Sequence, residues 1–429
     1  MGVHRLSIGL RATAAIFVVA LLATGAWATA TEELLYSFGD KATDGSTPYG
    51  ALIFDPSGNL YGITFAGGVY NLGTVFELTP KAGGGWTEKV LHNFNGKDGS
   101  GPYSRLIFDA SGNLYGTTFY GGSSAVCNAG CGTVFELSPE AGGGWKEKVL
   151  HNFTNGTDGS GSYASLILDA SGNLYGTTFY GGNSTACNGG CGTVFELIPK
   201  AGGHWKEKIL HNFGKSSMDG QSPVAGLIFD ALGNLYGTTR DGGGVHSWGY
   251  SQGTVFELTP LSGGGWREKI LHRFRPDVTD GNDPGSMLIF DASGNLYGTT
   301  FFGGKYSFGT AFKLTPQSGG GWAEKIVHAF GANNMESAPS SLIFDAAGNL
   351  YGTTQQDNNG GGGGTVFELS PKAAGGWTEN VLHEFPFNPT QTDGFSPYDG
   401  VIFDPAGNLY GTTQGGGTFG VGTVFEVTP

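Results

Sequence analysis

The chain has 429 residues, including 80 glycines and 18 prolines, and a formal net charge of −14. One ordinary hydrophobic core does not extend over this length, which favours a repeated unit. The acidic balance, without any basic run, argues against nucleic acid and anionic lipid as partners and favours solubility.

The first 28 residues have the features of a secretory signal. Arg5 and Arg11 supply positive charge, residues 12–26 are apolar, and Ala26-Trp27-Ala28 resembles a cleavage site. An uncleaved membrane anchor is the alternative, but the apolar run is short for a bilayer span. We therefore expect residues 29–429 to form one exported domain, secreted or periplasmic, monomeric and without a membrane span.

The rest of the chain repeats a short motif. Gly58-Asn59-Leu60-Tyr61-Gly62 returns at Gly112, Gly172, Gly233, Gly294, Gly348 and Gly407. An apolar run at 52–54 precedes it, and Asp55 with Gly58 and Asn59 favours a tight turn. Strands are predicted at 52–54, 60–65, 73–79 and 86–94, with no helical periodicity. Four antiparallel strands per unit predict an all-β, seven-bladed β-propeller.

The two ends of the chain predict a closed ring. Residues 34–38 match the fourth strand of a unit, whereas the last unit stops after its third strand at 422–427. We expect the N-terminal strand to complete the seventh blade and protect its sheet edge. Two of the connections have constant length and two vary. Because alternate hairpin ends lie on opposite faces, one face should be constant and the other should carry variable binding loops.

Four cysteines occur as two C-x3-C pairs in the same loop of adjacent repeats. In an exported protein the pairs Cys127/Cys131 and Cys187/Cys191 predict two local disulfides. A metal site is the disfavoured alternative, because no histidine flanks either pair. No metal or cofactor is expected.

Repeated polar residues are explained most simply by the fold. Six histidines share one position of the fourth strand, where we expect half-buried hydrogen-bonding residues: His92, His151, His211, His272, His328 and His383. Asp-Gly pairs such as Asp98-Gly99 recur in the variable loops. They could hold Ca2+, but the ligand spacing of a calcium loop is missing, and Asx turns are expected.

Non-repeating residues supply the candidate site. Aromatic residues follow the second strand of several units, among them Phe119, Tyr120, Phe179 and Tyr180. They could stack on sugar rings or pack under the loops. Arg240, Asp241 and His246 form the polar cluster that would be tested for catalysis. No nucleophile elbow, P-loop or HExxH motif is present, so no catalytic residue is assigned.

The recurring blocks L-I-F-D-x-x-G-N-L-Y-G-T-T, G-T-V-F-E-L and G-G-G-W-x-E-K-V-L-H-x-F resemble the GloVer tandem repeat. That is a family of exported bacterial proteins without an established activity, so the resemblance implies no catalytic residues. The segment D-x-x-G-N-L-Y is also similar to the blade turn of NHL-type propellers, which are mostly binding platforms.

Three functions fit these features. The first is a binding module for a glycan or a cell-surface protein, acting through the variable face. The second is a polysaccharide lyase or hydrolase, and the third is a structural component of an envelope or matrix.

Overall fold

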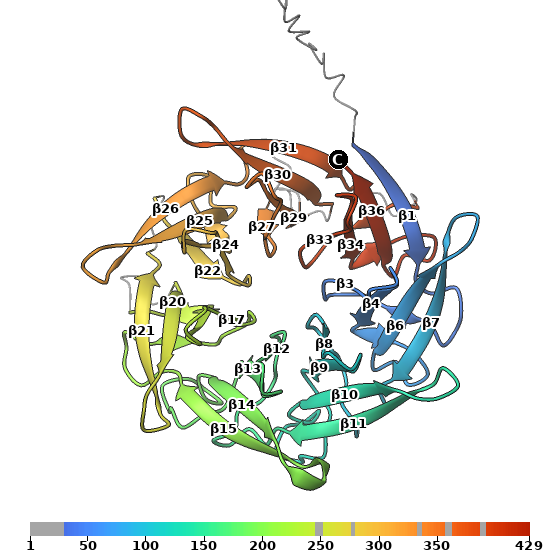
Figure 1. Ribbon diagram of the computed structural model, residues 1–429, viewed down its shortest axis with the longest axis horizontal. Helices are drawn as coiled ribbons and strands as arrows, with labels where there is room; N and C mark the ends of the chain where they lie inside the picture. Colours follow the sequence, from blue (N-terminus) through green and yellow to red (C-terminus); the bar gives the residue numbers. More distant parts are fainter. Residues whose placement is uncertain (1–29, 245–251, 276–278, 333–336, 357–362, 387–391) are drawn as a thin grey trace, which may run out of the picture.

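The computed structural model describes residues 30–244, 252–275, 279–332, 337–356, 363–386 and 392–429. Over these residues, seven antiparallel sheets stand around a central axis, as Figure 1 shows. The all-β, seven-bladed propeller predicted from the sequence is therefore confirmed. One short 3-10 turn, η1 (Ala201–Gly203), interrupts the β-structure. None of the helical structure in the described residues is long and apolar enough to cross a membrane.

Each blade has four main strands, and the first strand of the repeat lies nearest the axis (Figure 1). The inner strands are β3 (Ile53–Phe54), β8 (Ile107–Phe108), β12 (Ile167–Leu168), β17 (Ile228–Phe229), β23 (Ile289–Phe290), β28 (Ile343–Phe344) and β33 (Ile402–Phe403). The second strands are β4 (Leu60–Thr64), β9 (Leu114–Thr118), β13 (Leu174–Thr178), β18 (Leu235–Thr239), β24 (Leu296–Gly303), β29 (Leu350–Gln356) and β34 (Leu409–Thr413).

The third and outer strands complete the blades. The third strands are β6 (Thr74–Pro80), β10 (Thr133–Pro139), β14 (Thr193–Pro199), β20 (Thr254–Pro260), β25 (Thr310–Pro316), β30 (Thr365–Pro371) and β36 (Thr423–Thr428). The outer strands are β7 (Trp86–Asn93), β11 (Trp145–Asn152), β15 (Trp205–Asn212), β21 (Trp266–Arg273), β26 (Trp322–Ala329), β31 (Trp377–Glu384) and β1 (Thr31–Ser37).

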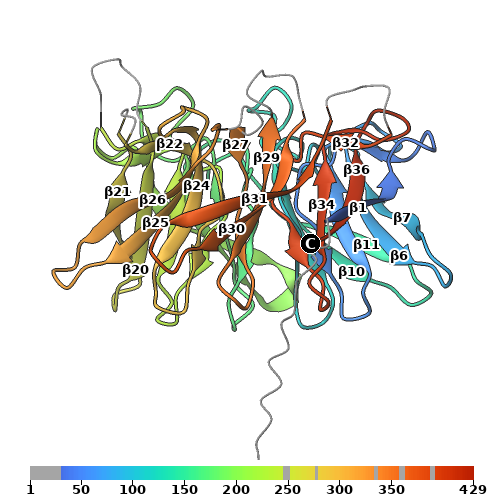
Figure 2. The same cartoon turned by 90° about the horizontal axis from the view of Figure 1, so that it is seen from above.

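Short strands in the loops extend this pattern on one face, the upper face in Figure 2. Three pairs stand apart from the main sheets: β2 (Gly45–Ser46) with β5 (Ala66–Gly67), β16 (Gly220–Gln221) with β19 (Asp241–Gly242), and β32 (Gly394–Phe395) with β35 (Gly415–Gly416). Two more join the second strand of their blade: β22 (Gly281–Pro284) pairs with β24, and β27 (Ser337–Pro339) with β29.

The N-terminal strand closes the ring as predicted. β1 pairs antiparallel with β36, with Thr31 opposite Thr428 and Ser37 opposite Thr423. Its register shifts between Leu34 and Tyr36, and the other outer strands shift at the equivalent place. β1 therefore reproduces even the irregularity of a fourth strand, and it covers an edge that would otherwise be open to aggregation.

The hydrophobic core lies between blades. In one cluster, Val75 and Phe94 of the first blade pack with Leu114 and Phe135 of the second. Tyr61 meets Phe108 of the next blade edge to face, with ring centroids 5.1 Å apart. An aromatic pair of this kind adds about 0.5–1.5 kcal/mol beyond the burial of its area. Neighbouring blades therefore stabilise each other, which explains how the chain exceeds the usual size of one core.

The tight turns form the constant face. In the second blade, Asp109 Oδ1 accepts hydrogen bonds from the backbone N–H groups of Ser111 and Asn113. Asp109 Oδ2 accepts hydrogen bonds from Asn113 Nδ2 and the Tyr115 hydroxyl. Burial raises the pKa of this carboxyl, but the hydrogen bonds outweigh burial and leave the pKa below its usual value. The turn interpretation of the repeated aspartate is confirmed.

A second polar cluster recurs at the blade junctions. His92 on β7 lies 3.2 Å from Asp98 in the loop that leads to the next blade. Glu147, on the outer strand of that next blade, has a buried Oε1 atom without a hydrogen-bond partner among the described residues. Burial raises the pKa of Glu147 to about 7, and Asp98 adds to the increase while His92 opposes it. This junction therefore combines a basic side chain with two acidic ones.

Candidate ligand-binding site at the mouth of the channel

A cavity of about 220 Å3 lies where the seven blades converge on the variable-loop face. Most of its wall comes from the short segments that precede the inner strands, and every blade contributes to it. Concave sites at the convergence of repeated units are frequent ligand sites. We call this cavity the mouth cavity.

One side of the mouth cavity is a row of four tyrosines. Tyr398, Tyr49, Tyr103 and Tyr163 come from the seventh, first, second and third blades. Tyr49 and Tyr103 are stacked at 4.8 Å, Tyr49 meets Tyr398 edge to face at 4.7 Å, and Tyr103 meets Tyr163 edge to face at 4.9 Å. The four rings therefore hold one another in place and form a continuous aromatic wall, which we call the tyrosine wall.

The opposite side has no tyrosine at this position. Val224, Gly285 and Pro339 stand there in the fourth, fifth and sixth blades. A Cβ atom on Gly285 would overlap the ring of Phe301, so the glycine makes room for that ring. Small residues on one side and tyrosines on the other place the cavity between two unlike walls.

Hydrogen bonds between blades fix the segments that carry the tyrosines. Thr117 Oγ1, on β9, donates to the carbonyl of Ala164 in the next blade at 3.1 Å. The backbone N–H of Ala51 donates to Asp399 of the seventh blade at 3.1 Å, and the N–H of Arg105 donates to Ser165 Oγ at 3.1 Å. Each lining segment is thereby attached to a neighbouring blade. A rigid site of this kind loses little entropy when a ligand binds.

The hydroxyl groups of the wall remain neutral at physiological pH. Burial raises the pKa of Tyr163 to about 12, and burial also raises the pKa of Tyr49, Tyr103 and Tyr398. Gln414 Nε2 donates to the Tyr49 hydroxyl oxygen at 2.8 Å. The wall therefore offers aromatic carbon together with neutral groups that both donate and accept hydrogen bonds.

An arginine–aspartate pair lies at the edge of the cavity. Arg240 Nε, just after β18, is 3.1 Å from Asp283 Oδ1 of the next blade. Burial raises the pKa of Asp283 to about 6; Arg240 opposes this increase and Asp241 adds to it. Arg240 also lines a second cavity of about 390 Å3, together with Phe302 and Gln355. Its partly exposed guanidinium therefore separates two adjoining hollows on the same face.

The model of the Gloeobacter/Verrucomicrobia repeat matches residues 21–249 and 245–429. The chain belongs to the Gloeobacter/Verrucomicrobia repeat family. This confirms the resemblance expected from the sequence. No curated protein matches the chain.

Among solved structures, this family member is similar to the extracellular domain of a one-component system from B. thetaiotaomicron. The TM-score is 0.55 at 11% identity, covering 92% of this chain and 39% of that one. It is also similar to an ulvan lyase, a polysaccharide lyase bound to a saccharide. There the TM-score is 0.53 at 11% identity, covering 92% of this chain and 94% of that one. Likenesses at this identity show the fold alone.

The four aromatic residues singled out after the second strands of this repeat protein divide into two groups. Phe119 is buried and packs against Tyr163 at 4.3 Å, so it supports the tyrosine wall from beneath. Phe179 lies beside the same tyrosine at 5.4 Å. Tyr120 and Tyr180 are exposed and line a separate groove of about 450 Å3.

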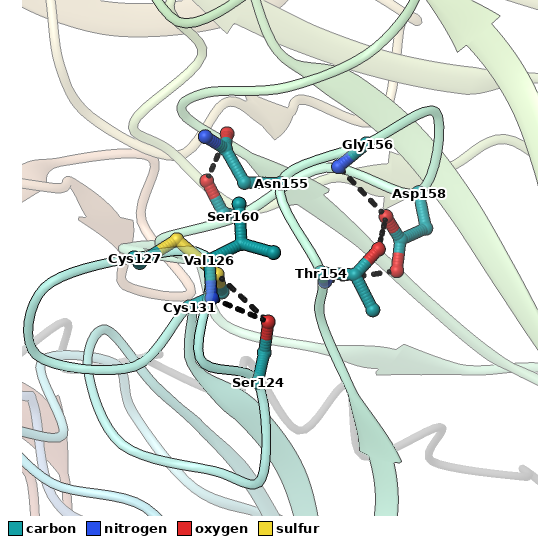
Figure 3. The surroundings of a disulfide bond; sticks show 9 residues. All are labelled: Ser124, Val126, Cys127, Cys131, Thr154, Asn155, Gly156, Asp158 and Ser160. Atoms are coloured by element: carbon teal, nitrogen blue, oxygen red, sulfur yellow. Dashed lines mark hydrogen bonds between the residues drawn. A yellow bond between two sulfur atoms is a disulfide. The ribbon is translucent and has the colours of Figure 1, made fainter.

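The two predicted disulfides are present, Cys127–Cys131 and Cys187–Cys191. The first of them lines the groove that holds Tyr120 and Tyr180. Figure 3 shows the first of them beside the loop that leads to the third blade. In that loop Asp158 accepts hydrogen bonds from the hydroxyl of Thr154 and the N–H of Gly156. Both sides of the groove are thus fixed by local bonds. Disulfides are typical of oxidising compartments and are consistent with export.

The predicted polar cluster is only partly brought together. Arg240 and Asp241 are neighbours, and burial raises the pKa of Asp241 while Arg240 opposes that increase. The third member, His246, lies outside the described residues. The bonded partner of Arg240 is Asp283, which sequence analysis did not select. It is 43 residues away and belongs to another blade.

The tyrosine wall was also missed from the sequence. The available signal was a position four residues before the inner strand that is tyrosine in four repeats and is not kept in the other three. Within a repeat, a position that varies near the axis is informative because the fold does not require any one residue there. That signal becomes useful only once the inner strand has been assigned.

Proposed function

We propose that this protein is an exported binding module for a neutral glycan, which it holds at the mouth cavity on the variable face. The tyrosine wall is the observation that carries the proposal. Sugar rings present flat C–H faces bordered by hydroxyls, and aromatic rings with neutral polar groups complement both features.

The size and charge of the site narrow the ligand class. A volume of about 220 Å3 is below the ~300–1,000 Å3 of pockets that enclose whole drug-sized ligands. It suits one terminal sugar ring of a longer chain, with the rest of the glycan lying over the adjoining hollow beside Phe302. Asp399, Asp283 and Asp241 make the surroundings acidic, and the whole chain carries a formal charge of −14, so polyanionic glycans are disfavoured.

The test is a glycan array followed by calorimetric titration of the best neutral oligosaccharide. Replacing Tyr103 with Ala removes the ring at the centre of the wall. We expect affinity to fall at least about tenfold, which corresponds to about 1.4 kcal/mol. Tyr70→Ala is the matched control, because Tyr70 is an exposed tyrosine on a variable loop outside the mouth cavity. A blank array, or equal affinity in the two variants, would overturn the proposal.

A polysaccharide lyase or hydrolase is the second candidate, favoured by one observation. A carboxyl with a pKa near 6 beside a guanidinium is suited to proton transfer near neutral pH, and Asp283 has this arrangement. The test is depolymerisation of the glycans that bind. Asp283→Asn should then abolish turnover while leaving binding within about twofold. If wild-type protein binds without cleaving, the module function stands alone.

A further inference from the structure

Three side chains meet at the junction of the third and fourth blades, away from the mouth cavity. His211 lies on β15, Asp219 in the loop that follows it, and Glu268 on β21 of the next blade. The exposed fractions of the His211 and Asp219 side chains are 4% each, and that of Glu268 is 17%. Figure 1 shows β15 and β21 on neighbouring blades at the rim of the ring. The cluster is thus buried between two separate sheets.

The distances from His211 to the two carboxyls are too long for hydrogen bonds of good geometry. His211 Nε2 is 3.6 Å from Asp219 Oδ1 and 3.5 Å from Glu268 Oε1. Neither His211 Nε2 nor Glu268 Oε1 has a hydrogen-bond partner among the described residues. Leaving such buried polar atoms unbonded is costly, so they call for an explanation. The atoms converge on one point, because the ligand atoms of the group all lie within 4.8 Å of one another.

A metal ion explains this spacing. Zn2+ binds imidazole nitrogen and carboxylate oxygen at about 2.0–2.2 Å with tetrahedral geometry, which separates neighbouring ligand atoms by about 3.3–3.6 Å. The observed separations of 3.5 and 3.6 Å match that range. We propose that His211, Asp219 and Glu268 bind a divalent transition-metal ion of the zinc class, which joins the third blade to the fourth.

The surroundings of Asp219 suit a ligand. Its Oδ1 accepts a hydrogen bond from the N–H of Gly220, and its Oδ2 accepts one from the N–H of Lys215, both at 2.8 Å. Backbone donors of this kind fix the orientation of a ligating carboxylate before the metal arrives. The loop between the blades therefore presents a preformed ligand. The metal itself would connect two strands that belong to different sheets.

The other blade junctions differ in how closely the histidine approaches its carboxylates. His151 lies 3.6 Å from Asp158 and 3.5 Å from Glu207, so it repeats the same geometry with more exposure. A group of Glu32, His383 and Asp393 is the third arrangement of this kind. By contrast, His92 is within hydrogen-bond distance of Asp98, which also accepts from Asn95 at 2.6 Å. At the first junction a tyrosine, Tyr36, replaces the histidine and donates to Asp44 at 2.9 Å.

The test is titration with Co2+, whose visible absorption bands report tetrahedral coordination. The exported protein is purified without a polyhistidine tag, and the His151→Tyr/His383→Tyr double variant serves as the background. Tyrosine is chosen because the first junction carries it naturally. We expect one equivalent of Co2+, displaced by Zn2+, and a melting temperature that rises with bound metal.

Adding His211→Tyr to this background should weaken Co2+ binding at least about a hundredfold, whereas adding the control His92→Tyr should not. Glu268→Gln in the same background provides a second removal of a ligand, should the histidine variant fold poorly by circular dichroism. Absence of the absorption bands, or bands that persist in both the His211 and Glu268 variants, would overturn the proposal. In that case the carboxyls of Asp219 and Glu268 share a proton instead.

Discussion

The tight turns and the blade junctions both repeat a polar cluster around the ring, yet they differ in how well their atoms are bonded. In the turn, each of the two carboxylate oxygens of Asp109 accepts two hydrogen bonds, and the pKa of the carboxyl lies below its usual value. At the junction, Glu147 keeps a buried oxygen without a hydrogen-bond partner in the described part of the chain, and burial raises its pKa to about 7. Repetition alone therefore does not show whether a residue serves only the fold. Whether the polar atoms of a residue are fully hydrogen-bonded is the better guide to its role.

The largest expected effect comes from removing one junction completely. A chain that begins at Gly39 lacks β1 and loses the buried side chains of Leu35 and Phe38. Each such loss costs about 2–5 kcal/mol, and the edge of β36 is also uncovered. We expect the cooperative unfolding transition to be lost. Calorimetry and size-exclusion chromatography measure this loss. The control chain begins at residue 30; equal melting temperatures for the two chains would contradict the role of β1 in closure.

The next effect tests the fully bonded turn. Asp109→Ala removes the acceptor of four hydrogen bonds, two of which come from the backbone. We expect the free energy of unfolding to fall by about 2 kcal/mol, measured by urea denaturation at pH 7. Ser111→Ala in the same turn is the control and should change stability by less than about 0.5 kcal/mol. A similarly small change for Asp109→Ala would show that the hydrogen bonds of the turn contribute little to stability.

A smaller effect tests the incompletely bonded junction through pH. The folded-state pKa of Glu147, about 7, lies above the ordinary value of 4.5 for a glutamate. The group therefore favours the folded state at low pH, and this contribution is lost as pH rises through about 7. Glu147→Gln should raise the free energy of unfolding at pH 8 by only about 1 kcal/mol, because solvent screens the partly exposed carboxylate. It should not raise the free energy of unfolding at pH 5.

The measurement is the urea midpoint at both pH values in the presence of a chelator, so that bound metal does not contribute. Glu140→Gln, in an exposed turn, is the control and should show no pH-dependent gain. A gain that is equal at pH 5 and pH 8 would show that the unbonded oxygen is not the cause.

The smallest effect concerns the fifth blade, where the turn cluster departs from the pattern. In the first blade the Tyr61 hydroxyl donates to Glu77, but Lys313 occupies the equivalent place and lies 3.6 Å from Asp291. Lys313→Glu gains an opposite charge across from Lys325 and loses the contact with Asp291. We expect less than about 0.5 kcal/mol of change in urea unfolding. A loss above about 1 kcal/mol would show that this turn depends on its lysine.

The fold was predictable because its signals are local. The turn at Asp55 and the strand that starts at Trp86 are each recognised from a few consecutive residues, and the copy number follows by counting. The strand at residues 34–38 matches a fourth strand, and the last unit lacks one, so the two ends indicated a closed ring. The disulfides were predictable for the same reason, since each closes a short loop.

The site was less predictable because it depends on contacts between blades. The pairing of Arg240 with Asp283 depends on which loops face each other. Whether Phe119 is exposed or buried depends on Tyr163, which belongs to the next blade. The unbonded oxygen of Glu147 also gave no signal, because a glutamate beside a lysine on an outer strand is typical of an exposed surface.

The antiparallel pairing of β1 with β36 also determines the order of events during synthesis. The first strand to be synthesised receives its partner last, because Thr31 cannot pair until Thr428 has been made. Six blades can form locally while the seventh waits for a contact that spans nearly the whole chain, and contacts of such long range are slow to form. Until then both ends of the growing arc expose unpaired strands, which makes this interval the one most open to aggregation.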